Sequence, residues 1–522
     1  METPQTQPPA DAKPAKRTPI DPPERSALWA PCGWAAHLGV AALLGALVLF
    51  TFVNTLHDTG FALDNKFIIL EDPRLRDANW ANVKLCFTED YWWPKAVSGL
   101  YRPLTTLSYL FNYSVLGSAE KAASYHWLNF VLHWANAVLV YFFVLVLMEK
   151  LWPALLTALL FSLHPIVTES VTNIVGRADL FAMLTVLCGF LCYAKSTVSR
   201  GWRRMLWLLL MMFVATLGVF CKESAVVLLP LMALYDFTYR YRRRVANWFL
   251  NFFANVWDFL IKGYIWLAPT LAGLWYVRRL VFGRLRPPEL PFVDNPLVDA
   301  DFWTVRLTSF KVIGRYFLLL LWPRHLSCDY SYNQIPMVHW PFRGWADWQA
   351  GVSIAVVIGL IALAVFSYRR KKPMFFFIMF FFLTFLPTSN LIRVIGSIMA
   401  ERFMYLPSIG YAGAVVIGMY SVCRRVVGKL DISTWAQRVW LQALARGLLA
   451  ALAVAYGVRT FIRNYDWEDD IILWTKAAAV SHNSFKTHKS LAYALYEKDP
   501  EGKNIDRIIE EGEKAAAVTD RA

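Results

Sequence analysis

The stretch that decides the fold is LNFVLHWANAVLVYFFVLVLM, residues 128–148, which contains no Asp, Glu, Lys or Arg. It is long enough to cross the hydrocarbon core of a bilayer, for which a helix needs about 20 apolar residues. Comparable apolar segments recur near residues 33–54, 151–165, 179–194, 205–221, 224–237, 263–282, 307–322, 351–367, 374–391, 404–422 and 441–458. The sequence therefore predicts an all-α polytopic membrane protein.

The composition of the chain excludes several other classes of protein. Of its 522 residues, 57% are hydrophobic and 17% are charged, against about 25% charged in an average soluble domain. Phe (36), Trp (23) and Tyr (23) are abundant, as is typical where aromatic rings lie at a bilayer interface. A soluble enzyme, a disordered chain, a coiled coil and a secreted disulfide scaffold are excluded.

The basic residues indicate the topology. The net charge is +15, and basic runs lie beside apolar segments at 203–204, 242–244, 369–372 and 424–425. This pattern is typical of cytoplasmic loops rather than of a nucleic-acid interface. With the N-terminus inside, all four runs stay cytoplasmic if the segment 307–322 lies on the outer surface as an interfacial helix. This topology has about eleven transmembrane helices and an outside C-terminal tail.

The topology divides the chain into three parts. Residues 1–32 are predicted to be a disordered cytoplasmic tail, 33–463 a transmembrane domain, and 464–522 a helical tail on the outside. Two long outside loops, 56–127 and 283–350, interrupt the transmembrane domain. Loops of this length inside compact proteins are usually functional.

The C-terminal tail has a helical pattern of apolar residues. We expect helices over 466–480, 484–497 and 505–518, and the last two form a pair with a tetratricopeptide-like period of roughly 34 residues. Fewer than about three such repeats rarely stand alone. The tail is therefore expected to pack on the membrane domain, to bind a partner, or to be a shortened repeat array.

Asp64 is the first candidate for chemistry. It lies shortly after the first apolar segment, so its carboxylate is expected near the membrane surface, between a lipid headgroup and an aqueous acceptor. A single loop acid is more often only solvated. The nearby acids Glu71 and Asp72 and the amphipathic stretch 101–109 favour a functional role.

Other ionisable residues gather on the same predicted side, in the loop 164–180, in the turn 222–223 and in the segment 393–408. Such residues at membrane depth are costly and usually functional. Guanidinium groups there suit a phosphate, which they can hold through two parallel hydrogen bonds. The alternative is a set of ion pairs that only order the loops: Arg177–Asp179, Glu169–Arg177 and Lys222–Glu223.

One acid near the interface with several cations in reach indicates chemistry on a phosphate-bearing lipid. The sequence shows no metal-ligand cluster, no Gly-rich nucleotide loop, no GxSxG element and no supported Cys/His dyad. We therefore expect no metal and no cofactor. The activated group would come from a lipid-linked donor that is made elsewhere.

Taken together, these motifs resemble those of the transmembrane and tetratricopeptide-repeat O-mannosyltransferases and their bacterial relatives. The resemblance covers about residues 33–500 and rests on the stretches 61–65, 101–107, 164–180, 222–223, 291–296 with Arg306, 326–331 and 401–410. It implies the GT-C glycosyltransferase fold and a polyprenyl-phosphate sugar donor, dolichyl-phosphate mannose in eukaryotes. It also implies a Ser or Thr hydroxyl as acceptor on the lumenal side, with the repeats helping to hold the protein acceptor.

The acidic pair that the family carries in its first loop corresponds to Asp64 and Asn65, so this sequence departs from the family at the second position. An amide cannot act as a base. Asp64 must then act alone, or Glu71, Asp72 or Glu169 must share the work. The repeat array is also shorter than is usual in the family.

The resemblance and the residue chemistry together assign roles. Asp64 is the expected base of an inverting, in-line displacement, and general base catalysis typically contributes about 10²–10⁴-fold. The leaving lipid phosphate needs fixed cations, and those expected to bind it are Arg402, Arg177, Arg393 and Lys222. The residues expected to bind the acceptor or to support the site are His164, Glu169, Asp179, Glu223, Arg102 and Glu401.

Three other functions remain open. A GT-C enzyme could transfer another lipid-linked sugar, such as arabinose or glucose, to a glycan or a lipid. A catalytically silent membrane scaffold would use the tail to recruit partners, and Asn65 favours this alternative. A transporter is disfavoured because the charges concentrate at the outer ends of the apolar segments.

The expected partners are a membrane lipid donor and a protein acceptor, with no nucleic acid, and the oligomeric state is left open. The active face is expected to look into the endoplasmic reticulum lumen of a eukaryote or into the periplasm from a bacterial inner membrane. The short tail and the Tyr91–Lys95 insertion resemble the bacterial relatives.

Overall fold

The computed structural model describes residues 33–57, 59–242, 245, 247–283, 290–429 and 435–519. The predicted disordered tail, residues 1–32, lies outside them. Within the described residues all regular secondary structure is helical. This agrees with the all-α class predicted from the apolar segments.

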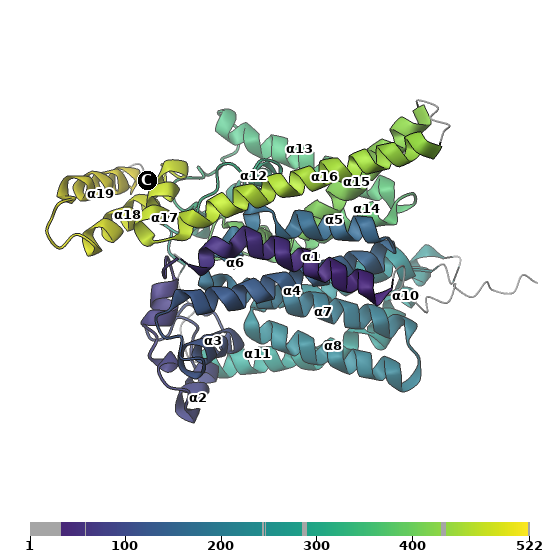
Figure 1. Ribbon diagram of the computed structural model, residues 1–522, viewed down its shortest axis with the longest axis horizontal. Coiled ribbons are helices and arrows are strands. Elements are labelled where there is room, and N and C mark those ends of the chain that lie inside the picture. Colours follow the sequence, from purple (N-terminus) through teal and green to yellow (C-terminus); the bar gives the residue numbers. More distant parts are fainter. Residues whose placement is uncertain are drawn as a thin grey trace, which may run out of the picture.

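The helices of the membrane domain lie side by side in one bundle (Figure 1). In chain order they are α1 (Trp34–Phe52), α4 (Ala122–Met148), α5 (Leu151–Ser162), α7 (Arg177–Val198), α8 (Gly201–Cys221), α9 (Leu228–Tyr235), α11 (Ala268–Phe282), α12 (Phe302–Leu321), α13 (Trp345–Tyr368), α14 (Lys372–Phe385), α15 (Ser408–Lys429) and α16 (Trp435–Asn464).

The remaining helices belong to the loops and the tail. They are α2 (Trp80–Thr88) and α3 (Pro103–Leu110) in the first long loop, the short α6 (Thr168–Val171), α10 (Trp248–Lys262), and α17 (Asp470–Val480), α18 (Phe485–Glu497) and α19 (Ile505–Thr519) in the tail. The three helices expected in the tail are thus present.

Several helices of the described chain are long and apolar enough to cross a membrane. These six segments are Trp34–Leu56, Ala122–Met148, Ile174–Val198, Gly201–Cys221, Trp345–Tyr368 and Val439–Trp467. The pair Leu151–Ser162 and Pro165–Val171, bent by 54°, would make a seventh span if it crosses as one unit. The chain is therefore a multi-pass integral membrane protein, and the finer count of about eleven spans stays a prediction.

The segment 307–322, predicted to be interfacial, lies in α12, which is not among the candidate spans of the described residues. Asp301 caps this helix by accepting a hydrogen bond from the backbone N–H of Trp303 (2.9 Å). The buried Lys311 donates from Nζ to the carbonyl of Pro336 (2.9 Å). The helix thereby holds the segment around Pro336, in the second half of the loop 283–350, which we name the central loop.

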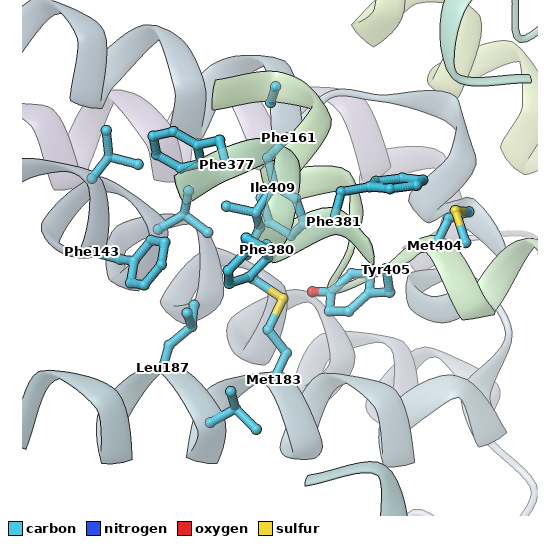
Figure 2. Packing of buried hydrophobic residues seen from close by; sticks show 14 of the residues in the cluster. Phe143, Phe161, Met183, Leu187, Phe377, Phe380, Phe381, Met404, Tyr405 and Ile409 are labelled. Atoms are coloured by element: carbon cyan, nitrogen blue, oxygen red, sulfur yellow. The ribbon is translucent and has the colours of Figure 1, made fainter. Parts of the chain in front are cut away.

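Aromatic side chains form the centre of the bundle. Figure 2 shows Phe143 of α4 and Phe380 of α14 converging with Met183 of α7, and the two rings lie 5.5 Å apart between centroids. Phe161 of α5 lies 5.5 Å from the ring of Tyr405. Such aromatic pairs contribute about 0.5–1.5 kcal/mol each beyond the burial of their area.

Tyr405 links this core to the segment that precedes α15. Its hydroxyl lies 2.7 Å from Nδ1 of His133 and accepts a hydrogen bond from Nδ2 of Asn136 (3.2 Å). Tyr405 directly follows the 3₁₀ helix Glu401–Met404, which carries Arg402. The packed core therefore fixes the position of Arg402.

Both long loops and the tail meet at one end of the bundle. The helices α2 and α3 of the first loop and α17 to α19 of the tail lie at the left end in Figure 1. Ala62 of the first loop and Cys328 of the central loop share a buried cluster with Trp467, Trp474 and Leu491. The tail thus packs on the membrane domain, the first of the three arrangements expected for it.

Candidate active site

Asp64 lies in a sharp turn of the first loop. The preceding residue, Leu63, has φ of +60°, a left-handed conformation that costs a non-glycine residue roughly 1–2 kcal/mol. Asn65, which follows, is buried, and its Oδ1 accepts a hydrogen bond from the backbone N–H of Val175 (3.0 Å). Asn65 therefore anchors the turn, whereas the half-buried carboxylate of Asp64 makes no hydrogen bond or ion pair with the described residues.

The carboxylate of Asp64 borders a cavity that we name the acidic cavity. It is enclosed by the first loop, the central loop, the segment before α15 and helix α18. Its walls are Leu63, Asp64, Asp294, Cys328, Asp329, Ser331, Ser397, Met399, Ala400, Arg402 and Lys486. Two groups that the sequence predicts to work together, Asp64 and Arg402, are thus brought to one cavity.

Arg402 is held in place by Glu169. Its backbone N–H donates to Oε2 of Glu169 (2.8 Å), and its guanidinium forms an ion pair with Oε1 of the same carboxylate. Glu169 is fully buried, while the Arg402 side chain remains 28% exposed. Burial alone would lower the pKa of Arg402, but Glu169, Asp64 and Asp179 together raise it. Arg402 is therefore a fixed cation with part of its surface free.

Arg402 also borders a second cavity, which we name the apolar cavity. Its walls are Asp179, Ala182, Met183, Val186, Lys222, Ser224, Val227, Thr384, Thr388, Arg402, Phe403, Tyr405, Leu406 and Pro407. Lys222 donates from Nζ to Oδ1 of Asp179 (2.6 Å) at its rim. An acidic and an apolar cavity therefore meet at one guanidinium group.

Arg102 and Glu223 form a separate ion pair of 2.9 Å beside this rim. Burial alone would raise the pKa of Glu223, but the charge of Arg102 and its hydrogen bonds lower it to about 2. Neither residue lines the two cavities. The pair connects the first loop to the end of α8 and supports the rim.

Glu401 is buried and does not line the acidic cavity, although its neighbours Ala400 and Arg402 do. Its Oε1 accepts hydrogen bonds from the backbone N–H of Ser327 (2.6 Å) and from the hydroxyl of Tyr330 (2.8 Å). Burial raises its pKa to about 7, although the charge of Arg463 opposes the shift. Glu401 therefore joins the central loop to the Arg402 segment rather than facing the cavity.

The structure places Arg177 away from both cavities. Arg177 is fully buried and donates to Oδ1 of Asn129 (2.9 Å), Oδ1 of Asn112 (2.7 Å) and the carbonyl of Tyr125 (3.1 Å). Its guanidinium also lies 4.9 Å from the centroid of the Tyr109 ring. These contacts occupy the guanidinium N–H groups of Arg177 that would otherwise bind a phosphate.

Arg393 and His164 also lie outside the two cavities. Arg393 is exposed. His164 is buried, with Nε2 at 2.9 Å from the carbonyl of Leu320 and Nδ1 accepting from the N–H of Ile166 (3.0 Å). Both ring nitrogens are occupied by the backbone, so His164 stabilises the bend after α5.

Three charged residues of the acidic cavity were not singled out from the sequence. Asp294 and Asp329 lie in the stretches 291–296 and 326–331 that carry part of the family resemblance, and that signal could have identified them. Lys486 comes from the tail helix α18, where no local pattern distinguishes it from other lysines.

The arrangement can hold a phosphate and deprotonate a hydroxyl. The described residues contain no group of three or more His, Cys, Asp or Glu side chains placed to bind a metal ion. The charged groups of the site are cations and carboxylates that the fold already holds in place. They can therefore stabilise the charge that develops during a reaction without reorganising.

Residues 284–361 match the family model described as protein O-mannosyl-transferase TMTC, DUF1736. The match includes α12, Asp294 and Asp329. The chain is similar to the TMTC O-mannosyl-transferases. The resemblance predicted from the motifs is thus confirmed.

Curated TMTC relatives match most of the chain. It is 28% identical over 487 residues to protein O-mannosyl-transferase TMTC3 of Mus musculus, covering 90% of this chain and 50% of the relative. It is 27% identical over 506 residues to TMTC2 of Homo sapiens (84% and 58% covered) and 28% identical over 531 residues to Tmtc1 of Drosophila melanogaster (85% and 58% covered). The chain spans about half the length of these TMTC relatives.

Among solved structures, the chain is similar to an oligosaccharyltransferase of Archaeoglobus fulgidus. The structure tethered with an acceptor peptide matches with a TM-score of 0.43 and 13% identity, covering 91% of this chain and 59% of that one. The structure in complex with an inhibitory peptide and a dolichol-phosphate matches with a TM-score of 0.42 and 13% identity, covering 91% and 60%.

Proposed function

We propose that this protein is a GT-C glycosyltransferase that moves mannose from a polyprenyl- or dolichyl-phosphate donor to Ser or Thr hydroxyls of proteins on the non-cytosolic face of the membrane. One observation carries the proposal: Arg402 borders both the acidic cavity that contains Asp64 and the apolar cavity beside it. The similarity to TMTC O-mannosyl-transferases supports the same chemistry.

The two cavities fit the two ends of such a donor. The isoprenoid chain would lie along the apolar cavity, against Met183 and Val186. The phosphate would then meet Arg402 and Lys222, whose cations can bind its oxygens. The sugar, attached to the far side of the phosphate, would enter the acidic cavity.

The reaction follows from this placement. As the acceptor oxygen forms its bond to the anomeric carbon, Asp64 takes the hydroxyl proton. The bond from the anomeric carbon to the phosphate oxygen breaks, and the leaving phosphate takes the electron pair. Arg402 stabilises the charge that develops on it. Attack opposite to the leaving group inverts the anomeric centre.

The position of Asn65 removes one objection to this mechanism. Its amide is buried against the N–H of Val175 and does not line the acidic cavity. An acid at this position would not be needed as a base if Asp64 alone faces the substrate. We therefore favour an active enzyme over a silent scaffold.

The remaining assignments belong to the same proposal. The active face would look into the endoplasmic reticulum lumen or the periplasm, because the loops and the tail that form the site lie at the end predicted to be outside. The transmembrane domain would comprise residues 33–463, and the helices of residues 464–522 would form a tetratricopeptide-like unit.

Mass spectrometry of a Ser/Thr peptide tests the proposed function. The purified protein is incubated with polyprenyl-phosphate mannose and, separately, with polyprenyl-phosphate glucose. We expect a peptide one hexose heavier with the mannose donor. Product only with glucose would change the sugar and keep the mechanism, and no product with either donor would contradict the proposal.

A further inference from the structure

The acidic cavity is also lined by charged groups that the proposed reaction leaves without a role. Asp294 and Asp329 belong to the central loop, and Lys486 belongs to the tail helix α18. Lys486 donates from Nζ to Oδ1 of Asp294 (3.0 Å), and the two side chains remain 42% and 30% exposed. They are therefore fixed by each other and still accessible from the cavity.

Asp329 is oriented by one hydroxyl of its own loop and one of the tail. Its Oδ2 accepts hydrogen bonds from the hydroxyls of Ser331 (2.6 Å) and Ser484 (2.8 Å). Within the described residues, Oδ1 of Asp329 and Oδ2 of Asp294 have no hydrogen-bond partner. Each carboxylate is therefore held in one orientation and still has one oxygen that can accept a hydrogen bond from a ligand.

The charge of Lys486 is stabilised by the carboxylates around it. Burial alone would lower the pKa of Lys486, but Asp329, Asp294 and Asp64 raise it. The ammonium group therefore stays charged, and it offers donors beside the two acceptors. A mixed set of fixed donors and acceptors suits a ligand rich in hydroxyl groups, because each hydroxyl both donates and accepts.

The position of the donor's phosphate determines which part of the donor reaches Asp294, Asp329 and Lys486. If the isoprenoid chain fills the apolar cavity and the phosphate lies at Arg402, the sugar must lie on the other side of that guanidinium. That side is the acidic cavity. The sugar then lies in the cavity that Asp64 and Arg402 share with Asp294, Asp329 and Lys486.

We propose that Asp294, Asp329 and Lys486 form the subsite that binds the hydroxyl groups of the donor's hexose, so that the C-terminal tail takes part in selecting the sugar. This inference rests on the proposed function. The carboxylate oxygens accept hydrogen bonds from ring hydroxyls, and the ammonium group donates to one. A site built for a hydroxyl discriminates strongly against a ligand without it, because its own polar groups are left unpaired.

Binding measurements test the subsite without requiring turnover. The full chain in detergent is titrated with a short-chain polyprenyl-phosphate mannose and with the same polyprenyl phosphate without a sugar. The ratio of the two dissociation constants reports the sugar's contribution. We expect the wild-type protein to bind the mannose-bearing lipid at least tenfold more tightly.

Asp294→Asn and Lys486→Met should each lower this ratio about tenfold, towards equal binding of the two lipids, since each removes hydrogen bonds to a charged group. Binding of the sugar-free lipid should stay unchanged, and Lys486→Arg should keep part of the preference. The matched controls are Asp299→Asn on the same loop and Lys476→Met on α17, both exposed and outside the cavity. Thermal unfolding confirms that each variant is folded.

The inference is overturned if the wild-type protein binds both lipids equally, or if folded Asp294→Asn and Lys486→Met keep the wild-type ratio. It is also overturned if these variants raise KM for the acceptor peptide and leave donor binding unchanged. Failure of the wild-type protein to transfer any sugar is a different result. It would contradict the proposed function, while the binding ratio would still decide the subsite.

Discussion

The backbone N–H of Leu63 donates a hydrogen bond of 2.8 Å to Oδ1 of Asp470 in the tail helix α17. Leu63 precedes the proposed base and has φ of +60°, a conformation that persists only when its surroundings hold it. A second link joins the N–H of Gly60 to the carbonyl of Glu468 (2.8 Å). The tail therefore fixes the turn that presents Asp64.

Asp470→Ala should lower kcat at least tenfold while changing KM for the donor little. The variant removes the acceptor that holds Leu63, so Asp64 spends less time in the productive geometry, and small misplacements of a catalytic group can cost about 100-fold. Steady-state transfer kinetics provide the measurement. Asp470→Asn keeps an acceptor oxygen and should restore most of the activity.

A matched control for this prediction is Asp506→Ala, an exposed acid on α19. It should behave as the wild-type protein. Equal activity of Asp470→Ala and Asp506→Ala would show that the tail does not position the base.

Arg402→Ala should weaken donor binding by about 10–100-fold, since it removes charge-assisted hydrogen bonds to the phosphate. It also leaves the fully buried Glu169 without its partner, so thermal stability should fall. Arg402→Lys separates the two effects because it keeps the charge but not the bidentate geometry. Donor binding at the wild-type level in folded Arg402→Lys and Arg402→Ala would remove Arg402 from the donor site.

Arg177→Met should destabilise the protein rather than weaken donor binding. The change leaves the buried acceptors on Asn129, Asn112 and Tyr125 without their donor, and each such group costs about 1–3 kcal/mol. The midpoint of thermal unfolding in detergent should therefore fall. A folded variant of normal stability with poor donor binding would instead support the phosphate role expected from the sequence.

Glu401 should make stability depend on pH. Burial raises its pKa to about 7 in the folded protein, so its neutral form stabilises the fold below the unfolded pKa and this contribution is lost as the pH rises through 7. Over the whole range between the unfolded and the folded pKa, the free energy of unfolding should fall by about 3 kcal/mol. Glu401→Gln keeps an acceptor for Ser327 and Tyr330 but cannot ionise.

The thermal midpoints of wild type and Glu401→Gln are therefore compared from pH 5 to pH 8. The wild-type midpoint should fall relative to that of the variant as the pH rises. Parallel curves would show that Glu401 does not titrate in this range.

The helical class and part of the candidate site were predictable because their signals are local. Apolar runs specify helices that can span a membrane, and Asp64, Lys222 and Arg402 lie at the ends of such runs, where charges are costly and therefore informative. Arg177 carries the same local signal as Arg402. Only the three-dimensional structure shows that Arg177 is enclosed by protein acceptors while Arg402 reaches two cavities.

The contribution of the tail could not be predicted from local pattern. Lys486 and Asp470 lie on polar helices, where lysine and aspartate are common and carry no signal. Their partners, Asp294 and Leu63, are 192 and 407 residues away in the chain. Contacts of that range depend on how the loops pack, which hydrophobic periodicity does not specify.

The most direct test of the account is the transfer of hexose to a Ser/Thr peptide by Asp64→Asn beside Asp77→Asn, an exposed acid of the same loop outside the acidic cavity. Product is measured by mass spectrometry, and donor binding is measured in parallel. The account predicts that Asp64→Asn binds the donor nearly as the wild-type protein does but forms at least 100-fold less product, while Asp77→Asn is fully active. Undiminished product from Asp64→Asn would contradict the assignment of Asp64 as the base.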